Sequence, residues 1–560
     1  MAYDLKSVKA PRLAGLGLRI FANLIEWGFP GKLIIPQLLR DAGVTAFRRK
    51  ASNEVPTLKP LVEVSVRTSG AASKAELKRI GALKAKPVGF RFPTASDYVS
   101  AYKKGRTNPE DVARAVSSAI RLSNDEALPL RAIIQHDPDD LLAQGRASAA
   151  RWRRGKPLGP LDGVPISIKD ELDQLGYRTT VGTRFLGTQP AIADATPVRM
   201  LREAGALLIG KANMHEIGIG VTGLNPHHGA ARNPYHTDYL TGGSSSGSGG
   251  SVAAGLCPIS IGADGGGSIR IPAAFCGVYG IKATFGRVSE TGAAPLCWSV
   301  AHVGPLAGTA RDLALGYAAV AGPDPLDPTS LAQPPLSFAH VNKKDLKGLR
   351  LGVYEPWFKH ASAPIVTACE DMLGRLKKRG ARVVSIELPD LEEIRVSHVI
   401  TISSEMAHSF DDRYPTGRRA FGHDVRVNLA LARSFTSRDY IHAQRVRTRA
   451  MENFARALER CDAIMTPTTG VVAPLLKPDA GSVGETDLTT LTEIMRFVVA
   501  ANFTGNPAVS FPVGYDSAGL PIGMQAMGRH WEEDLLLRIA MISEQELHRR
   551  APNSFFDIIK

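Results

Sequence analysis

Hydrophobic residues near the start of the chain recur at helical spacing. The stripe comprises Leu13, Leu16, Ile20, Leu24 and Trp27, and Phe21 and Ile25 widen it. Three polar residues, Arg19, Asn23 and Glu26, are expected on the opposite face, and they argue against a helix that spans a membrane. Pro30 is expected to end this helix, and a second apolar segment begins over residues 32–39. The pattern predicts two amphipathic helices.

Residues 51–90 are polar and basic with little periodicity, which is typical of a linker or an extended wrap. We therefore expect residues 1–90 to form a helical cap and linker, and residues 91–560 to form the main domain. A capping box over residues 107–110 predicts the start of a helix. Residues 136–155, rich in alanine and arginine, are expected to form another helix.

From about residue 160 the chain alternates between short apolar strands and amphipathic helices. Strands are expected at residues 164–168, 207–209, 258–261, 349–353, 383–388, 463–465 and 508–513, and helices at residues 197–204, 365–376 and 531–547. Such alternation predicts an α/β fold whose core is a large parallel or mixed β-sheet covered by helices. Residues 323–347, rich in proline, are expected to form a surface excursion.

Composition fits a globular protein with a large core, since 44% of the 560 residues are hydrophobic and 22% are charged. The formal net charge is +14, and basic proteins often meet nucleic acid or anionic membranes. No arginine-aromatic nucleic-acid module is present, so we expect no nucleic-acid partner. The basic amphipathic residues 12–40 fit peripheral contact with a membrane. The alternative is that these helices only pack on the domain behind them.

Cysteine usage points to a reducing compartment. The five cysteines form no Cys-x-x-Cys pair, which argues against a disulfide framework or a zinc site. No secretory signal opens the chain. We expect a protein that is cytoplasmic or peripheral to a membrane, and not secreted.

Two clusters of glycine and serine, residues 242–248 and 264–268, flank a predicted helix and strand. A Gly/Ser linker is the simplest alternative, but residues 252–254 and 257–259 interrupt the run with apolar side chains. Glycines let backbone N–H groups approach a ligand closely. A serine in such a loop can attack a carbonyl while the neighbouring N–H groups hold the oxyanion.

These two clusters, together with Ser268-Ile269-Arg270, resemble the sequence motif that defines the amidase signature family of serine hydrolases. Ala263 stands where the family pattern has threonine. The resemblance implies that Ser268 is the nucleophile, that Ser244 is the relay on a cis peptide, and that Lys169 is the base. A lysine can act as a base only when it is neutral, which requires burial near other donors. No cofactor is implied.

The resemblance also assigns supporting roles. Residues expected to bind the oxyanion or the substrate are Gly265, Gly266, Gly267, Ser268 and Met214. Asp264 and Arg270 are expected to brace the loop. Ser245 and Ser246 are expected to form only hydrogen bonds at the helix start.

The dipeptide His215-Glu216 invites comparison with zinc hydrolases. Their motif is His-Glu-x-x-His, and here Ile219 stands at the position of the second histidine. We therefore expect no metal site.

Segments along nearly the whole chain resemble plant-type fatty acid amide hydrolases within this family. They are residues 9–16, 21–24, 391–395, 397–400, 433–435, 439–441, 466–470 and 495–502. This resemblance implies a homodimer that hydrolyses N-acylethanolamines and related lipid amides. It also implies that the N-terminal helices cap a lipid channel and touch the membrane. Val221 stands where a threonine is expected, and this difference bears on which polar head group of a lipid amide the site would prefer.

Three other functions stay open on the sequence. The chain could be an amidase of small or aromatic amides, the glutaminase-type subunit of a tRNA amidotransferase, or a catalytically inactive lipid-binding scaffold. Intact Lys169, Ser244 and Ser268 argue against the scaffold.

Overall fold

The computed structural model describes residues 3–62, 64, 70–83, 88–481 and 483–559. Its centre is an 11-stranded sheet in the order β12-β11-β13-β16-β15-β9-β10-β8-β4-β5-β3. In that order the strands are Arg382–Ser385, Arg350–Val353, Ala463–Pro467, Pro521–Met527, Ala508–Tyr515, Tyr279–Lys282, Val303–Ala307, Ile259–Ala263, Pro165–Lys169, Leu207–Ala212 and Ile133–Gln135. β4 runs parallel to β5 and β8, and β11 runs parallel to β12 and β13, while the other pairs are antiparallel. The predicted mixed sheet is confirmed.

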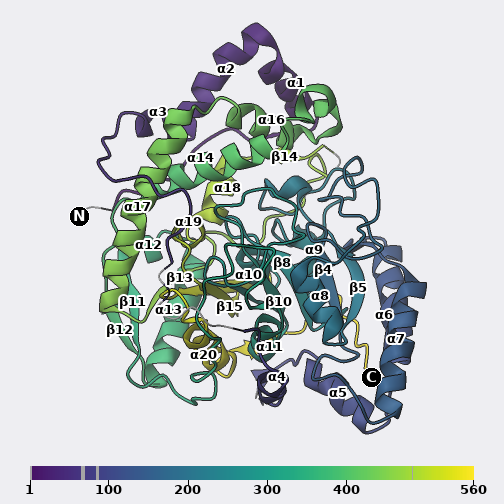
Figure 1. The fold of residues 1–560 in the computed structure, drawn as a ribbon. Helices are drawn as coiled ribbons and strands as arrows, with labels where there is room; N and C mark the ends of the chain where they lie inside the picture. Colours follow the sequence, from purple (N-terminus) through teal and green to yellow (C-terminus); the bar gives the residue numbers. More distant parts are fainter. Residues whose placement is uncertain (1–2, 63, 65–69, 84–87, 482, 560) are drawn as a thin grey trace.

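Helices cover both faces of this sheet (Figure 1). The glycine-rich α9 (Ser246–Ala253) packs on β8, β4 and β5, and α10 (Arg270–Phe275) packs on β9, β15 and β16. α11 (Ala310–Val320), α13 (Ala363–Lys378) and α20 (Glu533–Glu544) lie below the sheet in this view. The strand ends that carry the catalytic candidates therefore lie inside a continuous core.

Other elements frame this core. Further helices of the domain are α5 (Ala95–Lys103), α7 (Pro138–Arg153), α8 (Thr196–Glu203), α12 (Glu355–Phe358), α15 (Tyr414–Gly417), α17 (Ser437–Arg460), α18 (Leu488–Met495) and α19 (Val499–Thr504), with short 3-10 turns at Glu216–Gly218 and Arg418–Ala420. Short strand pairs join β17 (His548–Arg549) to β2 (Val88–Gly89) and β6 (Arg232–Asn233) to β7 (His236–Leu240). Residues 323–347 contain no helix or strand, but the segment is not only a surface excursion, because Phe338, Val341 and Leu346 are buried in the main core.

Two local predictions need correction. Helix α6 (Pro109–Asp125) is capped by Asn108, whose side chain accepts from two backbone N–H groups, so the cap lies one residue after the expected Thr107. The segment 51–90 is not only a linker, because it contains α4 (Lys74–Gly81) behind a Ser73–Glu76 capping box. Residues 63, 65–69 and 84–87 of that segment lie outside the described residues.

The N-terminal helices sit above the domain, over α14 (Leu391–Ser409) and α16 (His423–Ala432) (Figure 1). They are α1 (Gly15–Glu26), α2 (Gly28–Asp41) and α3 (Val44–Phe47). Leu13, expected to be helical, lies in β1 (Leu13–Ala14), which pairs with β14 (Glu485–Thr486). The helix break comes at Trp27, and Pro30 lies in the first turn of α2, where no intrahelical N–H is needed.

Helix α1 turns part of its polar face toward the protein, which the sequence pattern left open. Its buried residues are Leu18, Ala22 and Ile25. The polar residues Asn23 and Glu26 also face the protein, because both accept hydrogen bonds from Arg426 of α16. Much of the predicted apolar stripe is consequently turned outward: Leu16, Ile20 and Trp27 are 69%, 51% and 70% exposed. No helix within the described ranges is both long and apolar enough to span a bilayer.

Candidate active site

Lys169 ends strand β4 in the interior of the protein, where its side chain is only 1% exposed. Its Nζ donates to the Ser244 Oγ at 2.8 Å and to the Ala263 carbonyl at 3.1 Å. The Glu171 carboxylate lies 2.7 Å from the same nitrogen. A strand end thus carries a buried amine in direct contact with one of the predicted serines.

Ser244 lies on a loop that is held from several sides. The Gly243–Ser244 peptide bond is cis, as the resemblance implied. The Ser244 carbonyl accepts from the His215 N–H at 3.0 Å, and Gly243 N–H donates to the Val221 carbonyl at 2.7 Å. Ser245 N–H donates to the Ser268 carbonyl at 3.2 Å, which joins this loop to the second glycine cluster.

The second cluster places Ser268 between β8 and α10. Gly267 has a φ of +110°, and a Cβ there would lie 2.5 Å from the Val498 side chain, so only glycine fits this turn. The Gly267 N–H donates to Asp264 at 2.6 Å, which removes it from the predicted oxyanion donors. Within the described residues, the N–H groups of Gly265, Gly266 and Ser268 have no such acceptor, and no hydrogen bond joins the side chains of Ser244 and Ser268.

Asp264 and Arg270 brace this loop, as predicted. Arg270 donates to both carboxylate oxygens of Asp264, at 3.0 and 3.1 Å, and Asn502 adds a bond of 2.9 Å. Burial alone would raise the pKa of Asp264, but the charge and hydrogen bonds of Arg270, together with Asn502, hold it well below its usual range. Both charged side chains are fully buried, so they fix the backbone of residues 264–270 without touching solvent.

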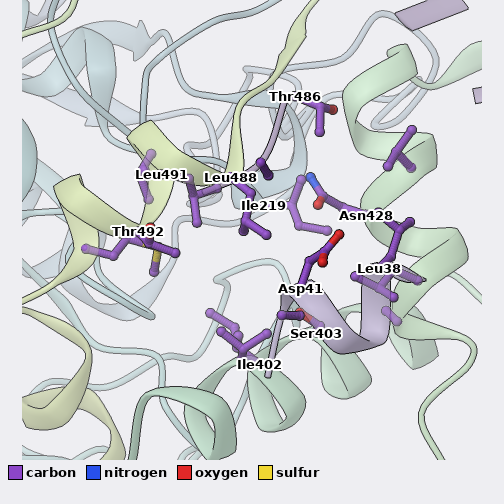
Figure 2. Close-up of a pocket in the computed structure, with 18 of the residues that line it drawn as sticks. Leu38, Asp41, Ile219, Ile402, Ser403, Asn428, Thr486, Leu488, Leu491 and Thr492 are labelled. Carbon is purple, nitrogen blue, oxygen red and sulfur yellow. The ribbon is translucent and has the colours of Figure 1, made fainter. Parts of the chain in front are cut away.

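A cavity of about 620 Å³ opens onto Ser268. Its walls come from α2, α14, α16, α18 and β14, and Figure 2 shows their side chains converging from different sides. Apolar residues dominate the lining: Leu13, Phe21, Leu33, Ile34, Leu38, Ile219, Val221, Val399, Ile402, Met406, Val427, Leu431, Phe435, Leu488, Leu491 and Met495. Polar groups are scattered among them, and the Asp41 carboxylate points into the space beside Ile219 and Asn428 (Figure 2). An elongated set of mainly apolar side chains therefore surrounds the space next to the Ser268 hydroxyl.

Two residues of this site were missed by the sequence analysis. His398 of α14 lines the cavity and binds the Gly265 carbonyl through Nε2 at 2.8 Å. Burial lowers the pKa of His398 to about 4, so its ring is neutral near pH 7. The second missed residue is Glu171. Its position two residues after Lys169 in the sequence could have suggested that its carboxylate lies near the lysine.

In this structure His215 and Glu216 each pair with another polar side chain, and Met214 is buried. His215 Nε2 lies 3.3 Å from the Asp424 carboxylate, and Glu216 lies 2.9 Å from His227. Across the described ranges no three histidine, cysteine or acidic side chains converge as metal ligands. Met214 is buried behind Gly218, where a Cβ would lie 3.6 Å from Ser244 Oγ and 3.8 Å from Met214 Cε. Its contact with substrate stays a prediction.

Comparison with known proteins decides the family. A family model described as amidase matches residues 114–537. The chain belongs to the amidase family. Fatty acid amide hydrolase of Arabidopsis thaliana is 40% identical in an alignment that covers 100% of this chain and 96% of the relative. One subunit of the glutamyl-tRNA(Gln) amidotransferase of Moorella thermoacetica is 35% identical over 80% of this chain and 96% of the relative.

Solved amidase structures share the fold. Native peptide amidase from Stenotrophomonas maltophilia superposes with a TM-score of 0.70 and 29% identity, covering 83% of this chain and 98% of that one. The resemblance to the amidase signature family is thereby confirmed. As a member of this family, the chain is an enzyme that hydrolyses amide bonds.

Proposed function

We propose that this amidase is a serine hydrolase that cleaves N-acylethanolamines and related fatty acid amides into free fatty acid and amine. The observation that carries the proposal is the apolar cavity of about 620 Å³ that opens onto Ser268. Similarity to proteins named fatty acid amide hydrolase supports the same substrate class. A small or aromatic amide would leave most of this apolar surface in contact with water.

The chemistry assigns Ser268 as nucleophile, Ser244 as relay and Lys169 as base. Ser268 Oγ attacks the amide carbonyl while its proton passes to Ser244 and the Ser244 proton passes to Lys169. The C–N bond then breaks, and the same relay returns a proton to the leaving amine. Water then loses a proton to the relay and attacks the acyl ester; the ester bond to Ser268 breaks, the relay returns the proton to Ser268 Oγ, and the fatty acid leaves. Glu171, 2.7 Å from Lys169 Nζ, stabilises the ammonium that forms during each transfer.

The oxyanion is assigned to backbone N–H groups of the second glycine cluster. We propose Gly265, Gly266 and Ser268 as donors and assign the Gly267 N–H to the brace with Asp264. Each such contact in a serine hydrolase typically contributes about 10²–10³ in rate. His398 holds the Gly265 carbonyl, so it orients the peptide group that presents the next N–H.

Acyl-chain dependence is the first test of the substrate class. We expect kcat/KM to rise along a series of N-acylethanolamines from acetyl to stearoyl, by up to about fourfold for each methylene that becomes buried. The measurement is amine release by the purified enzyme. Activity confined to short or aromatic amides would make the enzyme an amidase of small or aromatic amides. Glutamine hydrolysis with a partner subunit would assign it to the amidotransferase class.

The N-terminal helices are proposed to cap this cavity and to contact the membrane. Leu13 and Phe21 line the cavity from one side of the segment 12–40. On the outside, Leu16, Trp27 and Phe29 are 69–74% exposed, with basic side chains among them. An apolar surface with a basic rim is typical of helices that lie in the membrane interface. We propose residues 1–90 as cap and linker, residues 91–560 as the catalytic domain, and a location peripheral to a membrane.

Replacing Trp27 and Phe29 together by serine should weaken binding to lipid vesicles by about 100-fold, because each aromatic ring contributes about 1.5 kcal/mol or more when it leaves water. Flotation or co-sedimentation with vesicles measures this loss. The matched control replaces Ile192 and Leu326, which are 95% and 76% exposed elsewhere, by serine. If both double variants bind vesicles like the native enzyme, the membrane contact does not involve Trp27 and Phe29.

A homodimer also stays a prediction from the family resemblance. Exposed Val55, Leu58 and Leu61, on the segment that runs along α17, offer apolar surface that a second copy would cover.

A further inference from the structure

A second cavity, a groove of about 670 Å³, lies outside the proposed catalytic site. Its basic residues are Arg131, Arg184, Arg232 and Lys477, and two histidines, His227 and His228, join them. Asp238 is the one acidic residue in the lining among the described residues. The groove thus concentrates positive charge in a concave surface.

The four basic side chains are only partly balanced by nearby acidic groups, since Asp238 acts on Arg232 and Asp479 interacts with Lys477 at longer range. In the described part of the chain, none of them lies within 4.0 Å of a carboxylate. Arg232 Nη1 donates to the Thr237 carbonyl at 2.6 Å, but its Nε is buried without an acceptor among the residues that the structure describes. A buried donor without an acceptor is costly, so a ligand that supplied oxygen atoms here would be favoured.

The backbone beneath the groove is held in an uncommon conformation. Arg131 has a φ of +48°, in the left-handed region that residues other than glycine rarely adopt. Asn213 maintains this conformation, because its side-chain amide donates to the carbonyls of Arg131 and Gly229, both at 2.9 Å. Such strain persists where the surrounding structure enforces it, and it often marks a binding site.

Electrostatic effects agree with this geometry. Burial lowers the pKa of Arg232, and the neighbouring charge of Arg131 lowers it further. Burial also lowers the pKa of His228, with Arg184 acting in the same direction. The groove therefore carries mutual repulsion that a bound anion would relieve.

The groove opens beside the N-terminal cap. Residues of the loop 476–481 line it, and Asp479 of that loop pairs with Arg12, just before α1, at 2.6 Å. The following β14 lies next to α1 (Figure 1). A groove at this place lies at the edge of the surface proposed to contact the membrane.

We propose that this groove binds the phosphate group of an anionic lipid headgroup. Guanidinium groups match phosphate oxygens with paired N–H donors, and Lys477 adds a point charge. That the groove binds a phosphate group is inferred from the groove alone. That this phosphate belongs to a lipid rests on the proposed function and its membrane contact. The groove would then favour membranes that carry anionic lipid and orient the cap on them.

The test compares two double variants of equal charge. Arg184→Gln with Lys477→Gln removes two exposed groove cations that hold no hydrogen bond among the described residues, so folding should not suffer. Lys103→Gln with Lys104→Gln removes two exposed cations at the end of α5. Binding is measured on phosphatidylcholine vesicles with and without phosphatidylglycerol. We expect the groove variant to lose about 25-fold on anionic vesicles, about fivefold per residue, and the control to bind like the native enzyme.

Three outcomes would overturn the proposal. Equal losses in both variants would mean a general charge effect. A native enzyme indifferent to phosphatidylglycerol would exclude a headgroup site. Saturable binding of inorganic phosphate at the groove without preference for anionic vesicles would assign it to a soluble phosphate ester instead. Amide hydrolysis in detergent micelles is measured alongside, because both variants should retain it. Absent hydrolysis with intact anionic-lipid binding would refute only the proposed function.

Discussion

Replacing Ser268 by alanine should reduce kcat/KM for lipid amides by about 10⁵–10⁶-fold, to the level that substrate binding and the oxyanion donors alone can support. The reason is that acyl transfer needs a covalent nucleophile, and Ser268 lies in the glycine cluster at the end of the cavity. The measurement is product release under conditions of low substrate, combined with labelling by a fluorophosphonate probe. The variant should lose the label as well as the activity.

The same experiment tests whether three residues act as one unit. Lys169→Met and Ser244→Ala should each cause a loss approaching that of Ser268→Ala, since Lys169 Nζ contacts Ser244 Oγ at 2.8 Å. In a relay the losses are not additive, so the double variant of Lys169 and Ser244 should be about as slow as either single variant. Fully additive losses would mean that the two residues contribute independently.

Ser246→Ala is the matched control for these variants. Ser246 is a buried serine at the start of α9, two residues from Ser244, and its hydroxyl, which was expected to form a hydrogen bond there, has no partner among the described residues. Its removal should leave both kcat/KM and probe labelling close to native. A large loss in this variant, or an active Ser268→Ala enzyme, would show that the nucleophile has been assigned to the wrong serine.

Sequence was most informative where the chemistry is local. Lys169 and the cis peptide before Ser244 could be expected because the motifs that carry them resemble those of the amidase signature family, and the structure contains both features. Ser268 followed from the same motif, although its chemical role is still a prediction. The mixed sheet could be predicted because apolar strands alternated with amphipathic helices.

Contacts between distant parts of the chain could not be predicted. His398 meets Gly265 across 133 residues, and Asn502 meets Asp264 across 238 residues, so no local pattern reports either pair. The orientation of α1 could not be predicted for the same reason. Arg426 draws Glu26 inward from a helix 400 residues later, and the apolar stripe then turns outward. Periodicity shows that a helix has two faces but not which one the protein will cover.

The Asp264–Arg270 pair also predicts the largest loss of stability. Arg270→Met should lower the free energy of unfolding at pH 7 by about 3–5 kcal/mol, because it leaves a buried carboxylate without its cation. Hydrogen bonds from Asn502 and Gly267 remain and keep the loss within this range. Denaturant unfolding of the two proteins measures it. Arg350→Met is the control, since the Arg350–Asp462 pair lies at the surface and its loss should change the stability far less than the loss of the buried pair.

The pH dependence distinguishes this charge effect from lost packing. In the native enzyme the pKa of Asp264 is held below its unfolded value, so its ionisation contributes stability above about pH 4 that is lost as the pH falls further. In the Arg270→Met variant burial is no longer opposed by a cation, so the pKa of Asp264 should rise above its unfolded value. The variant then gains stability on acidification through protonation of Asp264, and the difference between the two proteins should shrink as the pH falls from 7 to about 5. A difference that stays constant with pH would mean that the lost contacts of the Arg270 side chain, rather than the uncompensated charge, destabilise the loop. Adding Asp264→Asn to the variant should recover part of the loss only if the charge is responsible.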